Sequence, residues 1–250
     1  MYTKEELKAS LFFDIETVAN EEIFTGHMEE IWIEKHHIKN YEKEIEYRNK
    51  KLILEKNNSI NGLDSQDYYN LKTKDTPSVN DIFLKYAPLS PEFGKILCIS
   101  IGIFDDNLEP EVECLLGTEE KIIKDFFGIV VNNPKLKLSG YNIKGFDIPF
   151  IVRRSLIKSL SLPTQLRLKG KKPWEISFND LAEDYKGLMW EMIPLDLLTT
   201  TFGIPTPKDE FGNHEVSTLY SRGIITQEQV GNYCNKDVKA NMLVCKKLLY

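Results

Sequence analysis

Residues 11–20 read LFFDIETVAN, a hydrophobic run that holds two carboxylates one residue apart. Leu, Phe and Ile suit a pleated, half-buried surface, so we predict a strand over residues 11–16. Side chains alternate between the two faces of a strand, which places Asp14 and Glu16 on the same face as Phe12. Two such carboxylates repel each other, and desolvation raises their pKa, so the pair needs a cation or a proton. A bound divalent metal or a strand end that emerges into water would each satisfy the pair, and this stretch alone does not choose between them.

The composition of the whole chain is that of a globular protein. It has 250 residues, of which 42% are hydrophobic and 28% charged, and this suits one large domain, or one domain with a substantial insertion. Residues 1–10 lack the apolar core of a signal peptide, and the longest apolar stretch, residues 96–104, is too short to span a bilayer. The four cysteines are scattered without a CxxC pair, which favours reduced thiols in a cytoplasmic protein.

The charge distribution is uneven. A net charge of −6 argues against a nonspecific nucleic-acid binder. Residues 148–174, however, contain no Asp or Glu, and their basic residues are Arg153, Arg154, Lys158, Arg167, Lys169, Lys171 and Lys172. Such a patch can follow a phosphate backbone. Taken alone, the segment fits a solvated helix face and a lysine-rich loop better.

The region after the first strand, about residues 20–90, is polar and favours helix. Glu and Lys recur at helical spacings over residues 36–57, which predicts an exposed helix, and residues 57–65 form a turn-rich break. We therefore predict a helical insertion here within a single domain that covers residues 1–250.

The rest of the chain mixes strands and helices. We predict strands over 95–104, 111–116 and 136–141, with a hairpin turn at 105–107. Helices are predicted over 117–133, from about 149, and from about 227 to the end of the chain. Thr226 and Gln229 fit a capping box for the last helix. Its apolar stripe is Val230, Cys234, Val238, Met242, Cys245 and Leu249. A strand meander followed by alternating helices predicts an α/β fold, a mixed sheet covered by helices.

A second acidic feature lies in residues 138–154, LSGYNIKGFDIPFIVRR. Asp147 follows a predicted strand and stands just before a helix, where Asp is common as an N-cap. Pro149 disfavours the helical conformation at Ile148, so we expect the helix to begin at Pro149. Asp147 then lies one place too early for an ordinary cap, which weakens the capping interpretation.

A third feature is YCNKD, residues 233–237. Tyr233 and Asp237 are four residues apart and therefore project together from the margin of the apolar stripe. An isolated pair of this kind is common on helices. Together with the other two features, it brings the number of candidate carboxylates to four, namely Asp14, Glu16, Asp147 and Asp237.

The order Asp-x-Glu, Asn-x3-Phe-Asp-x-Pro, Tyr-x3-Asp resembles the DEDD superfamily of 3′–5′ exonucleases, and Tyr233 in place of a His indicates the tyrosine subclass. Within it, the chain is similar to stand-alone predicted exonucleases related to the exonuclease domain of family B DNA polymerases. The matching motifs occur in family order and span nearly the whole chain: SPEFGKILCISIG (90–102), GYNIKGFDIPFI (140–151), KKPWE (171–175), GIPTPKDEFG (203–212) and YCNKDV (233–238).

The resemblance implies a ribonuclease H-like fold with a five-stranded mixed sheet. It also implies metal-dependent hydrolysis at single-stranded 3′ ends, with two Mg²⁺ or Mn²⁺ ions between Asp14, Glu16, Asp147 and Asp237. Hard oxygen ligands suit these ions, and two of them can serve an in-line phosphoryl displacement. Tyr233 is expected to orient the attacking water, because a phenol with a pKa near 10 is a poor base at neutral pH.

Other residues are candidates for substrate contacts. Asn142 can hydrogen-bond the terminal sugar or phosphate of the substrate. Arg153 and Arg154 can contact the phosphate backbone of the nucleic acid. Phe146 can stack on a base, although core packing is the favoured role. Asp180, a fifth carboxylate at a strand end, is expected to be a supporting residue rather than a ligand.

The substrate class stays open at this level. The polymerase-like motifs favour DNA, and an exoribonuclease is the near alternative. A non-catalytic nucleic-acid-binding module of the same fold is a third, which the presence of all four acids disfavours. A polymerase or repair protein is a candidate partner in trans, and no membrane association is expected.

Overall fold

The structure is a computed structural model that describes residues 2–58, 77–172, 175–206 and 215–249. Its centre is a five-stranded mixed sheet in the order β3-β2-β1-β4-β5. β1 pairs antiparallel with β2 and parallel with β4, so the strand that carries LFFDIETVAN is the central one. The strands are β1 (Ser10–Ala19), β2 (Gly94–Phe104), β3 (Pro110–Leu115), β4 (Lys137–Gly140) and β5 (Asn179–Asp180). The predicted α/β fold with a mixed five-stranded sheet is confirmed.

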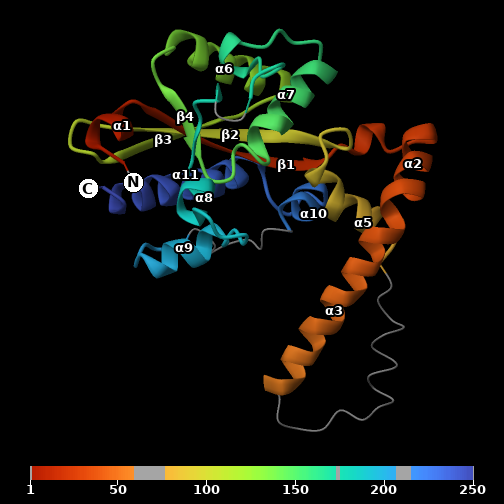
Figure 1. Cartoon of the computed structure of the whole chain (residues 1–250). Coiled ribbons are helices and arrows are strands. Elements are labelled where there is room, and N and C mark those ends of the chain that lie inside the picture. The colour runs from red at the N-terminus through yellow and green to blue at the C-terminus, as the bar shows by residue number, and fades with distance from the viewer. Residues whose placement is uncertain (1, 59–76, 173–174, 207–214, 250) are drawn as a thin grey trace.

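Helices cover both faces of the sheet because β1 buries both of its faces. Leu11, Phe13 and Ile15 belong to the cluster formed with α6 (Glu119–Asn132) and α7 (Asp147–Ile157). Phe12 instead joins the cluster formed with α11 (Gln227–Lys247). Figure 1 shows α6 and α7 above the sheet and α11 below it. The predicted alternation along β1 therefore holds, and it directs Asp14 and Glu16 toward α11.

The last helix follows its predicted course. α11 begins after Thr226, whose side chain accepts from the backbone N–H of Gln229 in the predicted capping box. The apolar stripe from Val230 to Cys245 is buried, and Val238 and Met242 pack directly against the cluster of Phe12. Packing of this stripe fixes the rotation of α11 and hence the direction of its polar margin.

The described parts of the region 20–90, residues 20–58 and 77–90, are mainly helical, as expected. Its elements are η1 (Glu21–Ile23), α2 (Gly26–Trp32), η2 (Ile33–His37), α3 (Ile38–Asn58), α5 (Val79–Tyr86) and η3 (Ala87–Leu89). Trp32, Phe83 and Phe93 belong to a separate small core. Nζ of Lys85 in α5 donates to Oε2 of Glu44 in α3 at 2.5 Å, which connects the two helices. α3 extends away from the sheet (Figure 1). Most of the predicted turn-rich break, residues 59–65, lies outside the described residues.

The remaining helices are short. They are α1 (Lys4–Lys8), η4 (Thr164–Leu166), α8 (Leu181–Lys186), α9 (Leu195–Thr201) and α10 (Val216–Ser221). Among the described residues, no helix combines the length and apolar character that crossing a bilayer requires.

The start of α7 corrects one prediction. The helix begins at Asp147, two residues before Pro149. The first N–H groups of a helix have no intrahelical acceptor, so a proline at the third position removes no hydrogen bond. The N–H of Ile148 donates instead to the carbonyl of Ile143 at 2.9 Å, which holds the turn in spite of the following proline.

Candidate active site

Three carboxylates converge between the sheet and the last helix. Asp14 and Glu16 come from β1 and Asp237 from α11, and one oxygen of each lies within 4.8 Å of the others. The packing described above makes this meeting possible, because the face of β1 with Phe12 is the face that α11 covers. Such a set of hard oxygen donors fits a divalent cation.

Asp147, the first residue of α7, lies beside these three carboxylates. It is 3% exposed, and its Oδ1 accepts the N–H of Ile15 at 3.1 Å, between the two acids of β1. The hydrogen bond fixes the first turn of α7 on the central strand. Asp147 stands beside the three-oxygen cluster and lines the same pocket, so the structure brings all four predicted carboxylates to one cavity.

The cavity has a volume of about 430 Å³ and joins five segments of the chain. The segments are β1, the β4–α7 connection, α7, the α8–α9 connection with the first turn of α9, and α11. Its lining residues are Asp14, Ile15, Glu16, Tyr141, Asn142, Phe146, Asp147, Met192, Ile193, Pro194, Leu195, Asp196, Tyr233 and Asp237. Among these described residues there is no Lys or Arg to neutralise the acids.

Burial and mutual repulsion disfavour ionisation here. Burial raises the pKa of Asp14, and the charge of Asp147 raises it further. Burial likewise raises the pKa of Glu16, with added repulsion from Asp14 and Asp237. For Asp147, burial raises the pKa to about 7, and the N–H of Ile15 partly offsets that rise. A cation that binds all four groups would relieve the repulsion and favour the ionised forms.

Tyr233 lies at the same pocket, one turn before Asp237 on α11. Burial raises the pKa of its phenol, and the negative charges of Asp237 and Glu16 raise it further. The hydroxyl is therefore protonated at neutral pH. It can orient a bound molecule through a hydrogen bond, and it is a poor base.

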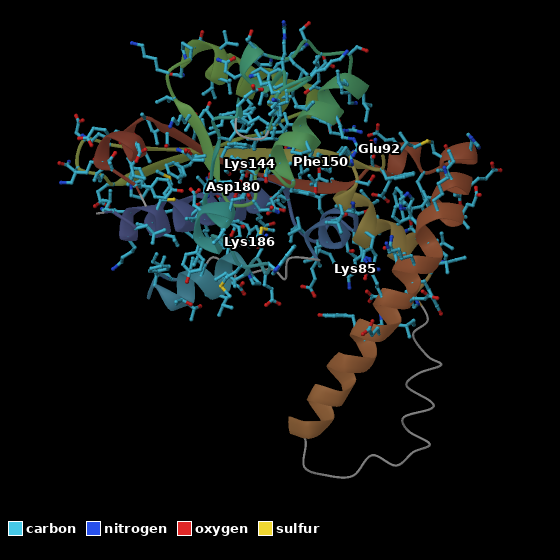
Figure 2. The ribbon with its side chains drawn as sticks, viewed as in Figure 1. Lys85, Glu92, Lys144, Phe150, Asp180 and Lys186 are labelled. Atoms are coloured by element: carbon cyan, nitrogen blue, oxygen red, sulfur yellow. The ribbon has the colours of Figure 1, made fainter. Side chains whose placement is uncertain are left out.

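Asp180 shapes the loop that carries Asn142 and Asp147. Its buried carboxylate accepts the backbone N–H groups of Asn142 at 2.8 Å, Lys144 at 2.9 Å and Ala182 at 3.1 Å. Figure 2 shows Lys144 and Asp180 side by side. These bonds hold Asn142 at a φ of 57° and cap α8, which is the supporting role expected for Asp180.

Asn142 and Phe146 both line the pocket. The Asn142 side chain lies over Gly145, where an added Cβ would come within 2.4 Å of its Oδ1, so the bare glycine leaves room for this amide. Phe146 is half-buried, and its ring centroid is 5.4 Å from that of Phe150 in the core cluster. The Phe146 ring therefore packs against the core, which is the role that the sequence analysis favoured over base stacking.

The structure does not bring Arg153 or Arg154 to this pocket. Arg154 is 2% exposed, and its Nε and Nη2 each lie 2.7 Å from a carboxylate oxygen of Glu119. Its Nη1 donates to the carbonyl of Pro91 at 2.8 Å, and Arg153 pairs with Glu92 on the surface. Acids from outside the acid-free window therefore pair with both arginines, and the structure does not support their predicted substrate contacts.

Sequence reasoning missed one wall of the pocket. Residues 192–196, the end of the α8–α9 connection and the start of α9, line the pocket and add a further carboxylate, Asp196. The hydroxyl of Tyr141 donates to the carbonyl of Ile193 and fastens this segment beside Asn142. The sequence of this segment has no periodic pattern. Only the folded structure shows that it lies beside the family motifs.

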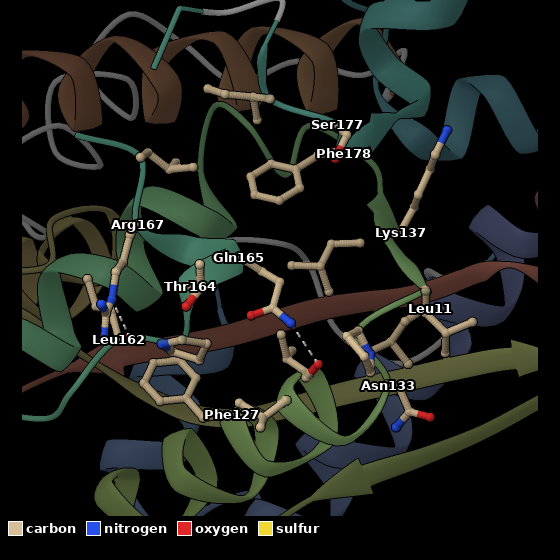
Figure 3. A pocket seen from close by; sticks show the side chains of 18 of the residues that line it. Leu11, Phe127, Asn133, Lys137, Leu162, Thr164, Gln165, Arg167, Ser177 and Phe178 are labelled. Carbon is tan, nitrogen blue, oxygen red and sulfur yellow. Dashed lines mark hydrogen bonds between the residues drawn. The ribbon is translucent and has the colours of Figure 1, made fainter. Parts of the chain in front are cut away.

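A larger cavity, about 1110 Å³, lies elsewhere (Figure 3). It is lined by Leu11 of β1, by Phe127 of α6, and by the segment that carries Gln165 and Arg167. The side chain of Gln165 donates to the carbonyl of Val130 across it at 3.2 Å. None of the four candidate carboxylates lines this cavity, whereas all four line the smaller one.

Comparisons with known proteins agree with this geometry. The sequence profile of a family described as predicted 3′–5′ exonucleases related to the exonuclease domain of PolB matches residues 86–249. No curated protein matches the chain. The solved family B DNA polymerase of the hyperthermophilic archaeon Pyrobaculum calidifontis superposes with a TM-score of 0.50 at 18% identity, over 66% of this chain and 23% of the polymerase. At this identity the similarity establishes the fold, which is of the ribonuclease H-like type.

Proposed function

Because this chain belongs to the family of predicted 3′–5′ exonucleases related to the exonuclease domain of PolB, we propose that it is a metal-dependent 3′–5′ exonuclease. It removes nucleotides from single-stranded 3′ ends, with DNA as the favoured substrate. The observation that carries the proposal is the pocket in which Asp14, Glu16 and Asp237 crowd their oxygens together, with Asp147 beside them. Such crowding is unfavourable without cations, and phosphodiester hydrolysis is a reaction that uses them.

The four carboxylates are the proposed metal ligands. Their oxygens suit Mg²⁺ or Mn²⁺, and two such ions, if held by these residues, would help to activate water and to neutralise charge on the leaving oxygen. The protein fixes the ligand geometry through secondary structure: β1 sets Asp14 and Glu16, and the hydrogen bond to Ile15 sets Asp147. The turn of α11 that is packed against β1 sets Asp237.

Tyr233 and Asn142 position the reacting groups. The protonated phenol of Tyr233 holds the attacking water by a hydrogen bond, and its raised pKa excludes it as the base. Asn142 presents its amide to the terminal sugar or phosphate from a loop that Asp180 fixes. Both roles need rigid side chains, and each residue comes from a segment with buried neighbours.

Degradation of matched end-labelled single-stranded DNA and RNA tests the proposal. We expect a ladder from the 3′ end with Mg²⁺ or Mn²⁺, none with EDTA, and a loss of about a thousandfold in Asp14→Asn, since metal-assisted charge stabilisation is worth several kcal/mol. Asp106→Asn is the matched control, because its fully exposed carboxylate is remote in sequence and pairs with Lys8 on the surface.

The outcomes separate the alternatives. Preferred cleavage of RNA would assign an exoribonuclease. A folded protein that binds metal and both strands but cleaves neither would be a binding module, and full activity in Asp14→Asn would remove this pocket from the reaction. Tyr233→Phe should slow cleavage with little change in the metal concentration required, because the phenol acts on water.

A further inference from the structure

Four large apolar side chains stand in water between α8 and α9, and the mechanism above does not use them. They are Leu188, Met189, Trp190 and Met192, which we call the apolar arm, and their exposed fractions are 103%, 72%, 97% and 44%. Contiguous exposed apolar residues mark binding surfaces in soluble proteins. A tryptophan with its whole ring in water is the most unusual of the four, because burial of this ring is so favourable.

The apolar arm is continuous with the wall of the catalytic pocket. Met192 itself lines the pocket, and so do the next four residues of the chain, 193–196. Trp190 is two residues away from Met192, which limits their Cα separation to about 7 Å. A strand whose 3′ end lies at the carboxylates therefore leaves the pocket within reach of Trp190.

The base of the apolar arm is held firmly while its tip is bare. The hydroxyl of Tyr141 donates to the carbonyl of Ile193, and Ile193 packs against the core cluster of α11. On the N-terminal side, the arm follows α8, and Asp180 caps the first turn of that helix. An aromatic side chain on a fixed base suits the stacking of a ligand, because little conformational entropy of the protein is lost on binding.

The occupant follows from the neighbouring chemistry. The pocket, at about 430 Å³, has the size of a small-ligand site, so only the end of a strand fits inside and the next nucleotides lie outside. Unpaired bases expose their π-faces, and aromatic side chains stack on them with little regard to sequence. Paired bases have their faces covered by neighbours in the duplex.

We propose that the apolar arm, through Trp190, stacks on the unpaired bases next to the 3′ end and makes the site selective for single-stranded ends. The inference rests on the proposed exonuclease function and assigns the substrate-reading surface of the same site. Trp190 is thus a positioning residue: it holds the strand that enters the pocket and takes no part in the hydrolysis.

The test compares a long and a short substrate in the full chain. Trp190→Ala should raise KM for a single-stranded oligothymidylate about ten- to hundredfold and narrow the preference for single over double strands. Hydrolysis of thymidine 5′-p-nitrophenyl phosphate, which ends inside the pocket, should be unchanged. Trp190→Phe should restore most of the lost affinity, because the aromatic face is kept.

Leu197→Ala is the matched control, since Leu197 is an exposed apolar residue of α9 outside the arm. An unchanged KM in Trp190→Ala, with the small ester still hydrolysed, would overturn the inference and leave the arm as a contact for a protein partner. If the wild-type protein hydrolyses neither substrate, quenching of Trp190 fluorescence by oligothymidylate, absent in Trp190→Phe, still tests stacking. That result separates failure of this inference from failure of the proposed function.

Discussion

Two groups of charges lie at different places around the central sheet, and they are built in opposite ways. In the first, Glu119 and Arg154 share two hydrogen bonds of 2.7 Å, and each also bonds a backbone group, the carbonyl of Pro91 for Arg154 and the N–H of Ile96 for Glu119. In the second, Asp14, Glu16, Asp147 and Asp237 share a pocket in which the described residues supply no Lys or Arg. The first group pairs opposite charges, and the second gathers like charges around a pocket.

The difference separates a structural charge from a functional one. A buried ion pair with its hydrogen bonds complete holds α7 against α6, and it needs nothing further. Crowded carboxylates lower the stability of the metal-free fold, and a protein keeps them only where a ligand offsets the repulsion. The contrast can be tested by removing one charge from each group.

Arg154→Met gives the largest expected change in stability. It leaves the buried carboxylate of Glu119 with the more distant and more exposed Lys158, at 3.6 Å, as its one cation among the described residues, so the free energy of unfolding should fall by about 3–5 kcal/mol. Urea denaturation measures the loss, and Arg153→Met on the exposed neighbouring position should cost less than about 1 kcal/mol. The double variant Glu119→Gln with Arg154→Met should recover much of the stability. A stability of Arg154→Met equal to that of the wild type would contradict the structural role.

Metal binding should act only on the second group. At a Mg²⁺ or Mn²⁺ concentration one hundred times the Kd, the wild-type protein should gain about 2.7 kcal/mol of stability, and EDTA should remove it. Asp14→Asn should lose most of this gain, yet be at least as stable as the wild type in EDTA, because one repelling charge is gone. Thermal unfolding with and without metal measures both effects, with Asp106→Asn as control. Equal metal stabilisation in Asp14→Asn would rule out its ligand role.

The third expected effect is a pH dependence of the metal-free protein. The pKa of Asp147 is about 7 in the fold and near 4 in the unfolded chain, so the folded state holds more protons between these values. Stability should therefore fall as pH rises from about 4 through 7, by at most about 1.4 kcal/mol per pH unit. Subtracting the curve of Asp147→Asn in EDTA isolates this contribution. Parallel curves for the two proteins would show that Asp147 ionises freely.

Sequence patterns predicted the elements that are periodic. The alternation at residues 11–16 predicted both faces of β1, and the stripe from Val230 to Cys245 predicted the buried side of α11. Those two patterns fix the directions of the neighbouring side chains, and the family resemblance implied that Asp14, Glu16 and Asp237 share one site. Membership of the family and the fold are confirmed, whereas the single-domain boundaries with an insertion stay a prediction.

The errors concern contacts between distant segments. The partner of Arg154 is Glu119, which lies in a different helix, so a count of charges along residues 148–174 overstated the free positive charge. The first turn of α7 depends on the bond from Ile148 to Ile143 and on Asp147 reaching β1, and neither is visible in local propensity. Residues 192–196 have no pattern at all, and the fold alone brings them to the pocket.

The order of strands also governs when the centre can exist during biosynthesis. β1 leaves the ribosome before its two neighbours, β2 and β4, which come from much later in the chain, and Asp237 lies later still, in α11. Pairings this far apart in sequence form slowly, after the loops between them close. Asp14 and Glu16 of β1 are therefore joined by Asp237 only after α11 has packed against the sheet. A nascent chain without that helix has no complete carboxylate centre, so we expect the proposed activity only after α11 has been synthesised and released from the ribosome.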